Sequence, residues 1–284
     1  MSNKSIFEQN HDYWLKRALG YSDVNKEELS GIQRKTWSEL LEKQISKHFE
    51  GKGYDRENIR ILDMGAGPGF ISIILTELGY RVTAADFAET MLEEARKNAG
   101  EISEKIEFRQ EDAMNLSFED ESFDVIVSRN LTWNLPDPEK AYGEWLRVLK
   151  SGGLMLVFDA NWYAFLVDEK KKSEYDNDRK NVEEQGFDDY NIGEDFDVMD
   201  RIAMLLPLTK IVRPKWDKDI LTELGAGSVT TTEDIGSIVY SEKEKVNYAS
   251  TGSFRQGRVR NHRNRPYGRN GGKGKRTCGK KYSI

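Results

Sequence analysis

The chain has 284 residues, and 37% of them are hydrophobic, which is enough for a substantial buried core. Its formal net charge is −6. One cysteine excludes an internal disulfide and a cysteine-based zinc site, and the three histidines are scattered, so we expect no metal site. No stretch has the apolar length of a membrane span, and the first residues lack the basic-then-apolar order of a secretory signal, which predicts a soluble, cytoplasmic protein.

The N-terminal part is predicted to be helical. Apolar residues in 25–49 recur at helical spacing with charged residues between them. We assign residues 1–50 to an N-terminal helical lid.

Strands and helices then alternate over residues 58–159. The expected strands are residues 58–64, 81–87, 105–112, 122–130 and 154–160, and the expected helices are residues 70–80, 88–100 and 137–153. This alternation predicts an α/β fold with a doubly wound, mostly parallel sheet, whose ligand lies at the carboxyl ends of the strands. We assign residues 51–250 to this domain.

The alternation stops at residues 160–226, which we interpret as an insertion after the fifth strand. Within it, residues 168–200 carry thirteen acidic and five basic side chains. Two interpretations stay open. The segment is either a solvated helix with a loop, or a cover for the active site with the apolar residues 200–208 as its inner wall.

The sequence "ILDMGAGPGF" (residues 61–70) predicts a sharp turn between the first strand and the next helix. Gly65, Gly67 and Gly69 alternate, whereas a dinucleotide fingerprint requires Gly or Ala where Phe70 stands. No Gly-Lys-Ser/Thr follows, which excludes a nucleoside triphosphate loop. The turn therefore offers bare backbone to a flat or extended ligand.

Acidic residues stand at the ends of three successive strands. Asp86 can accept hydrogen bonds from both hydroxyls of a ribose, and Asp112 from an adenine amine, beside the backbone N–H of Ala113 for a ring nitrogen. Asp63 precedes the glycine turn and can orient its amides or meet a ligand ammonium group. Two further residues, Phe87 and Met114, are placed to sandwich the base.

These blocks, together with "LPDPEKAYGEWLRVLKSGG" (135–153), resemble the successive motifs of class I S-adenosylmethionine-dependent methyltransferases of the small-molecule type, which include the quinone C-methyltransferases. The likeness spans about residues 58–160 and implies a Rossmann-like methyltransferase fold. It implies S-adenosylmethionine as the cofactor and a small-molecule acceptor as the partner.

The resemblance also implies roles for individual residues. Asp63 and the three glycines would lie along the methionine part of the cofactor, Asp86 at its ribose, and Asp112 with Ala113 at its adenine. Asn130 would border the reacting methyl group. The lid would close over the cofactor through residues 13–25, with Tyr13 or Tyr21 near the sulfonium.

Candidates for acid–base work and acceptor contact are few. His11 lies in the lid and is our candidate base. Asp159 follows the fifth strand at the ligand edge of the sheet, where we expect it to contact the acceptor, near Asn161. The aromatic rings of Trp133 and Trp162 belong either to the pocket wall or to the core.

The last part of the chain, residues 251–284, is predicted to be a basic, disordered tail. It holds eleven Lys and Arg residues and no Asp or Glu. The fold should end in an antiparallel hairpin that residues 225–241 can begin, but no apolar-alternating strand follows residue 250. Two explanations stay open: residues 254–284 bind nucleic acid through phosphates, or the segment is not the natural ending of the fold, for instance through a shifted reading frame.

The alternatives to a small-molecule enzyme are an RNA or protein methyltransferase recruited through this tail, and a non-catalytic S-adenosylmethionine-binding module. The acidic insertion would repel a polyanion, which favours the small molecule.

Overall fold

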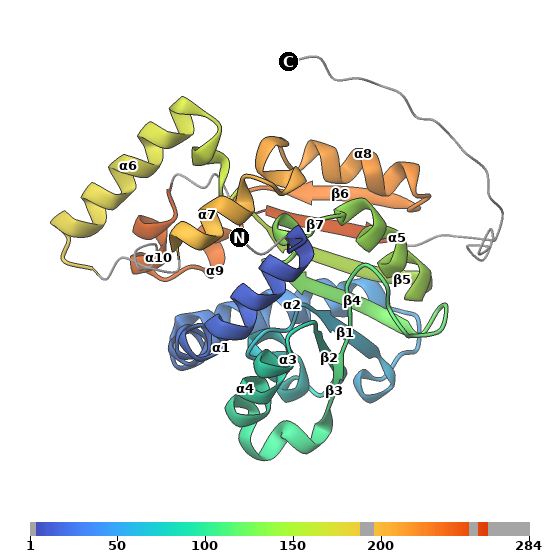
Figure 1. Cartoon of the computed structure of the whole chain (residues 1–284). Coiled ribbons are helices and arrows are strands. Elements are labelled where there is room, and N and C mark those ends of the chain that lie inside the picture. The colour runs from blue at the N-terminus through green and yellow to red at the C-terminus, as the bar shows by residue number, and fades with distance from the viewer. Residues whose placement is uncertain (1–3, 188–195, 250–254, 261–284) are drawn as a thin grey trace.

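The computed structural model describes residues 4–187, 196–249 and 255–260. A seven-stranded sheet forms its centre, in the order β3-β2-β1-β4-β5-β7-β6 (Figure 1). Its strands are β1 (Arg60–Met64), β2 (Arg81–Asp86), β3 (Ile106–Gln110), β4 (Phe123–Arg129), β5 (Leu149–Asp159), β6 (Ser228–Thr232) and β7 (Arg255–Arg260). Strands β1 to β5 pair in parallel, which confirms the predicted doubly wound sheet.

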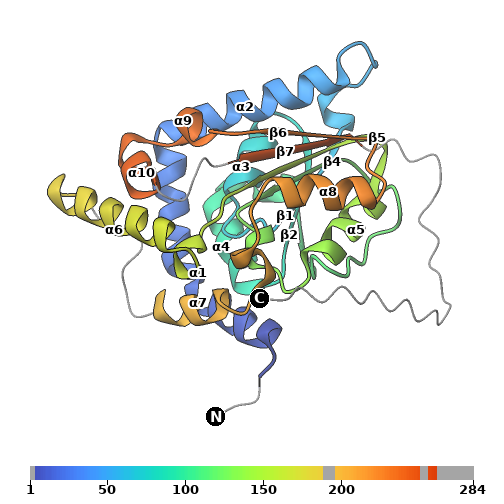
Figure 2. The same cartoon turned by 90° about the horizontal axis from the view of Figure 1, so that it is seen from above.

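Helices cover both faces of the sheet, as the view from above shows (Figure 2). The main helices are α1 (Ile6–Ser30), α2 (Ile32–Phe49), α3 (Phe70–Glu77), α4 (Glu89–Ala99), α5 (Pro138–Val148), α6 (Glu169–Glu184), α7 (Phe196–Ala203) and α8 (Lys215–Glu223), followed by the short α9 (Gly236–Val239) and α10 (Glu242–Asn247). Successive residues of a strand point to opposite faces. Accordingly, Ile61 packs with α2 and α3 on one face, whereas Leu62 packs with α5 on the other.

The N-terminal part is helical, as the sequence pattern predicted. Helix α1 begins at Ile6, after a capping box in which Ser5 and Glu8 satisfy each other's backbone N–H groups. Within residues 25–49, where apolar residues recur at helical spacing, the helix is interrupted at Gly31, where the backbone is extended. Helix α1 packs against α4 and α7, so it crosses the carboxyl edge of the sheet instead of covering a face.

Strand β7 corrects our expectation that no strand follows residue 250. It runs antiparallel to both β5 and β6. Gly257 lies opposite Val157, and the fully buried Val259 lies opposite Met155 in the α5 face of the core. Gly257 and Val259 alternate with Arg258 along the strand, and because a glycine stands where an apolar side chain was expected, the strand lacks the alternating apolar pattern that we searched for. Residues 261–284 lie outside the described residues.

The predicted insertion contains helices α6, α7 and α8, of which α8 packs on the sheet beside β6 and β7. Part of its acidic stretch, residues 188–195, lies outside the described residues. In the described part, α6 is largely exposed, with Asp178 and Val182 as its buried residues. The apolar residues Met199, Ile202 and Leu206 pack against Tyr13 of α1, so the predicted insertion contacts the predicted lid.

Candidate cofactor and acceptor site

The glycine turn between β1 and α3 brings bare backbone to the end of β1. Gly65 has φ +75°, and a Cβ atom there would lie 2.7 Å from Leu131, so a side chain is excluded by conformation and by space. Gly67 has φ +52° and donates its N–H to Asp86 at 2.9 Å. Gly69 instead faces Ala95 of α4, which assigns it to helix packing rather than to the pocket wall.

Asp86, at the end of β2, is held by two backbone donors. One carboxylate oxygen accepts from Gly67, and the other accepts from Ala88 at 2.9 Å. Burial raises the pKa of Asp86, although these two bonds favour its ionised form. Phe87 follows it and meets the rings of Phe7 and His11 edge-on, at centroid distances of 4.7 and 4.5 Å. The end of β2 therefore presents an anchored carboxylate beside an aromatic surface.

Asp112 lies beyond the end of β3 in a tight turn. Its side chain accepts from the backbone N–H of Met114 at 2.9 Å, and both residues line the pocket. Ala113 is buried between them, and its carbonyl accepts from the indole N–H of Trp145 at 3.0 Å.

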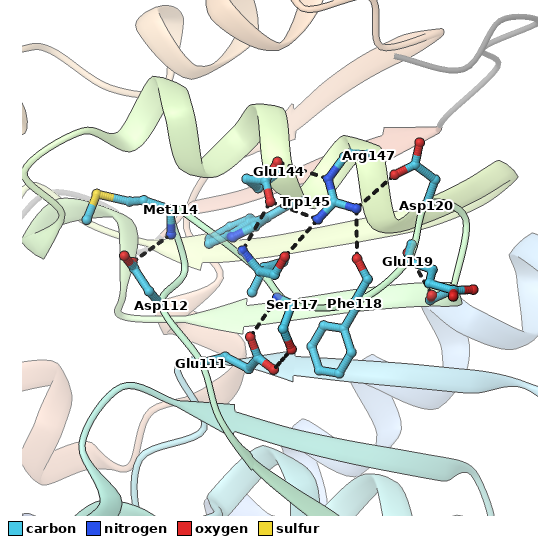
Figure 3. A network of polar contacts seen from close by, with 12 residues as sticks. Glu111, Asp112, Met114, Ser117, Phe118, Glu119, Asp120, Glu144, Trp145 and Arg147 are labelled. Carbon is cyan, nitrogen blue, oxygen red and sulfur yellow. Dashed lines mark hydrogen bonds and ion pairs between the residues drawn. The ribbon is translucent and has the colours of Figure 1, made fainter. Parts of the chain in front are cut away.

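A network that sequence reasoning missed holds this turn on α5 (Figure 3). Arg147 donates to the carbonyls of Leu116 and Phe118, at 3.0 and 2.8 Å, and to Asp120 at 2.8 Å. Glu144 accepts from the N–H of Leu116 at 3.0 Å and also pairs with Arg147. The segment after β3 is thus fixed by side chains 27 to 31 residues further along the chain.

At the end of β4, Asn130 adopts φ +57°, a conformation that few residues other than glycine tolerate. Its N–H donates to the carbonyl of Phe158 at 2.9 Å, and its side-chain oxygen is buried without a hydrogen-bond partner among the described residues. Arg129 precedes it and forms an ion pair with Glu28, while its guanidinium lies 4.6 Å from the ring of Phe70. Arg129 was also missed, because its partner is remote in sequence.

Asp63 lies below the pocket and does not line it. Its carboxylate is 1% exposed and accepts from the hydroxyl of Ser72 at 2.6 Å. Burial raises its pKa to about 7, against the hydrogen bonds from Ser72. The predicted trio of strand-end carboxylates is therefore divided, with Asp86 and Asp112 on the pocket wall and Asp63 beneath the glycine turn.

Helix α1 closes the pocket with one face. Side chains at helical spacing, Phe7, Asn10, His11, Trp14 and Tyr21, all line it. Tyr21 reaches Gly67, since a Cβ on that glycine would lie 3.5 Å from its ring. Of the two predicted lid tyrosines, the structure thus brings Tyr21 to the pocket, and Tyr13 packs on the opposite side.

Together these elements line one pocket, whose empty space is about 740 Å³ when the open solvent at its mouth is counted. The remaining lining residues are Gly65, Gly67, Asp86, Phe87, Met91, Asp112, Met114, Arg129, Asn130, Leu131, Asn134, Leu135 and Pro136. Most predicted site residues thus converge on one pocket at the carboxyl edge of the sheet.

Asp159 does not join them, which corrects the expectation of acceptor contact. It is buried with Arg213, at 2.8 Å, and accepts from the backbone N–H of Trp133 at 3.0 Å. The expectation that an acid at the end of a strand contacts the ligand is wrong here, because Arg213 of the insertion forms an ion pair with the carboxylate. Trp133 and Trp162 pack in a core cluster next to Tyr13 and do not line the pocket.

Within residues 4–187, 196–249 and 255–260, no group of three or more His, Cys, Asp or Glu side chains is arranged to hold a metal ion. In the same ranges, each helix is either too short or too polar to span a bilayer.

Comparison with known proteins gives matches over this site. Residues 62–157 match the family model described as "Methyltransferase domain". A demethylmenaquinone methyltransferase of Clavibacter sepedonicus is 43% identical over 99 residues, covering 34% of this chain and 40% of the relative. A phosphatidylethanolamine N-methyltransferase of Cereibacter sphaeroides is 34% identical over 122 residues, covering 42% of this chain and 57% of the relative.

Among solved structures, a Methanococcus maripaludis protein assigned to the S-adenosyl-L-methionine-dependent methyltransferases superposes with a TM-score of 0.54 at 22% identity, covering 93% of this chain and 98% of the other. This likeness concerns the fold. The chain spans about half the length of the curated relatives it matches.

Proposed function

We propose that this chain, whose residues 62–157 match the family model described as "Methyltransferase domain", transfers a methyl group from S-adenosylmethionine to a small acceptor that is not anionic. One observation carries the proposal. Asp86, Asp112 and Asn130, from the ends of three strands, line one pocket with the glycine turn, under a single face of α1.

The residues present fit the cofactor. Each oxygen of Asp86 accepts one backbone N–H, and a carboxylate offers about four acceptor sites, so it retains capacity for two ribose hydroxyls. Asp112 offers an acceptor and Met114 and Phe87 offer apolar contact for the adenine, since all three line the pocket. Asn130 presents a buried carbonyl oxygen that lacks a partner among the described residues, which favours contact with a donor or a cationic group of the ligand.

When bound, S-adenosylmethionine supplies an electrophilic methyl group on its sulfonium. The protein's task is then to hold the acceptor in line with that methyl group and to exclude water. Such positioning contributes on the order of 7–11 kcal/mol to lowering a barrier. Helix α1 serves both needs, because its Trp14 and Tyr21 form part of the pocket wall.

The charge of the pocket argues against an anionic acceptor. Among the residues that line it, all of which the structure describes, Arg129 is the only Lys or Arg, and its guanidinium is already paired with Glu28. No further guanidinium or ammonium group is present to neutralise a phosphate or carboxylate on the acceptor. Asn10 and Asn134, with Trp14 and Leu135, provide amide and apolar surface instead.

His11 contacts Phe87 at the adenine end of the pocket. We therefore assign it to the wall of the cofactor site rather than to the proton transfer that we considered from the sequence. This assignment leaves Asn130 as the residue that borders the methyl group.

The tail-recruited alternative receives less support than before. Residues 255–260 belong to the sheet as β7, so part of the basic segment has a structural use. The remainder, residues 261–284, lies outside the described residues. A non-catalytic binding module remains an alternative that turnover measurements decide.

The proposal is tested by calorimetry with S-adenosylhomocysteine and by turnover of isotope-labelled S-adenosylmethionine with two acceptor panels. One panel holds neutral phenols, quinols and amides, and the other holds their phosphorylated or carboxylated counterparts. We expect binding of S-adenosylhomocysteine and methylation in the neutral panel. Binding of a nicotinamide or flavin nucleotide instead, or methylation of only the anionic panel, would overturn the cofactor or the acceptor assignment respectively.

A further inference from the structure

A buried cation ties the insertion to the sheet beneath the pocket. Arg213, just before α8, is 5% exposed and lies between two carboxylates. Its Nε lies 2.8 Å from Asp217, and its Nη1 lies 2.8 Å from Asp159. The hydroxyl of Tyr142 donates to Asp217 at 2.6 Å, so α5 joins the same cluster. A buried charge that is paired on several sides holds its neighbours in one arrangement.

The cluster of Arg213, Asp159, Asp217 and Tyr142 also forms hydrogen bonds with the loop that follows β4, residues 130–136. Arg213 donates to the hydroxyl of Thr132 at 2.7 Å. Asp159 accepts both from that hydroxyl and from the backbone N–H of Trp133 at 3.0 Å. The indole N–H of Trp133 in turn donates to the carbonyl of Asn130 at 3.0 Å. The loop is therefore fixed from below at two successive residues, within the short helix η3 (Thr132–Asn134).

The same loop meets the pocket and the lid on its other side. Asn130, Leu131 and Asn134 line the pocket, and the side-chain amide of Asn10 in α1 donates to the carbonyl of Asn134 at 2.7 Å. A continuous series of polar contacts thus runs from α8 through Arg213 and the loop to α1.

We propose that Arg213 is a positioning residue for methyl transfer. It contacts Thr132, Tyr142, Asp159 and Asp217, and through Thr132 and Asp159 it sets the place of the loop that carries Asn130 and Asn134. The inference rests on the proposed function for its catalytic consequence, but the coupling between Arg213 and the loop is measurable without turnover.

The test compares Arg213→Met and Arg213→Lys with Lys215→Met as a control. Lys215 is an exposed neighbour whose ion pair with Asp219 lies on the surface. Three quantities are measured on the full chain: amide hydrogen exchange in residues 130–136 and 6–14, the affinity for S-adenosylhomocysteine, and the kcat and KM for methyl transfer.

For Arg213→Met we expect faster exchange in both segments, because the amide of Trp133 loses an oriented acceptor. A misplacement of about 1 Å in an active site can lower turnover by roughly 10²-fold, so kcat should fall about 10- to 100-fold, while affinity for S-adenosylhomocysteine changes less than about fivefold. Arg213→Lys should recover part of the loss, and the control should match the parent protein.

Unchanged exchange in residues 130–136, or a loss of S-adenosylhomocysteine affinity as large as the loss of kcat, would overturn the positioning role. If Arg213→Met does not fold, Thr132→Val removes the hydroxyl contact alone, and the same exchange pattern is expected from it. Should S-adenosylhomocysteine not bind the parent protein at all, the proposed function fails, and hydrogen exchange still decides whether Arg213 controls the loop.

Discussion

Replacing Asp86 by alanine gives the sharpest test of the cofactor site. The carboxylate accepts one backbone N–H on each oxygen and retains about two acceptor sites. Two hydrogen bonds from ribose hydroxyls to a charged group contribute roughly 1.5–3 kcal/mol each, or about 3–6 kcal/mol together. The affinity for S-adenosylhomocysteine should therefore fall roughly 10²- to 10⁴-fold. Asp86→Asn keeps one acceptor oxygen, so its affinity for S-adenosylhomocysteine should lie between those of the parent protein and Asp86→Ala.

The measurement is isothermal titration calorimetry at pH 8, which favours the ionised carboxylate because burial raises the pKa of Asp86. Glu89→Ala is the control, since Glu89 is an exposed acid of the next helix that pairs with Arg96. Thermal unfolding of each variant shows whether the loss of acceptors for Gly67 and Ala88 disturbs the fold. An affinity within threefold of the parent protein, in a folded Asp86→Ala variant, would refute the reasoning.

Three further predictions concern stability, measured as the free energy of unfolding in urea. Because burial raises the folded-state pKa of Asp63 to about 7, above its unfolded value, its ionisation destabilises the protein as pH rises. The free energy of unfolding of Asp63→Asn, relative to that of the parent, should therefore be about 2–3 kcal/mol larger at pH 7 than at pH 5. A difference between the two proteins that is equal at both pH values would contradict this. Gly65→Ala should cost about 1–3 kcal/mol more than Gly152→Ala, since both have positive φ but only Gly65 meets Leu131 at 2.7 Å; equal losses would contradict the contact. Val259→Ala should lower the free energy of unfolding by about 1–2 kcal/mol, because Val259 is fully buried. No change in that free energy would mean that residues 255–260 do not pack in the sheet.

The sequence predicted those features that depend on neighbouring residues. The order of strands and helices follows from local hydrophobic patterns, and Asp86 and Asp112 reach the pocket because parallel strands end at the same edge of the sheet. The glycine turn was predictable for the same reason. Even there the division among the acids was missed, since Asp63 stands two residues before Gly65 and is covered by Ser72 of α3.

Features that join distant segments could not be predicted in this way. Arg129 pairs with Glu28, 101 residues earlier, and no local pattern links them. Asp159 carries the same strand-end signal as Asp86, but Arg213 from the insertion neutralises it and keeps it out of the pocket. The choice between Tyr13 and Tyr21 depended on which face of α1 meets the sheet, and α7 decides that face by packing on Tyr13.

The order of the last strands has a consequence for how the protein is made. Strand β7 lies between β5 and β6 but follows both in the chain. During synthesis, the edge of β5 that pairs with β7 therefore stays unpaired until residues 255–260 have left the ribosomal exit tunnel. An unpaired strand edge is a template for joining another chain, so a polypeptide halted before this point would be prone to aggregate. Strand β7 thus makes correct folding depend on translation that has run past residue 260.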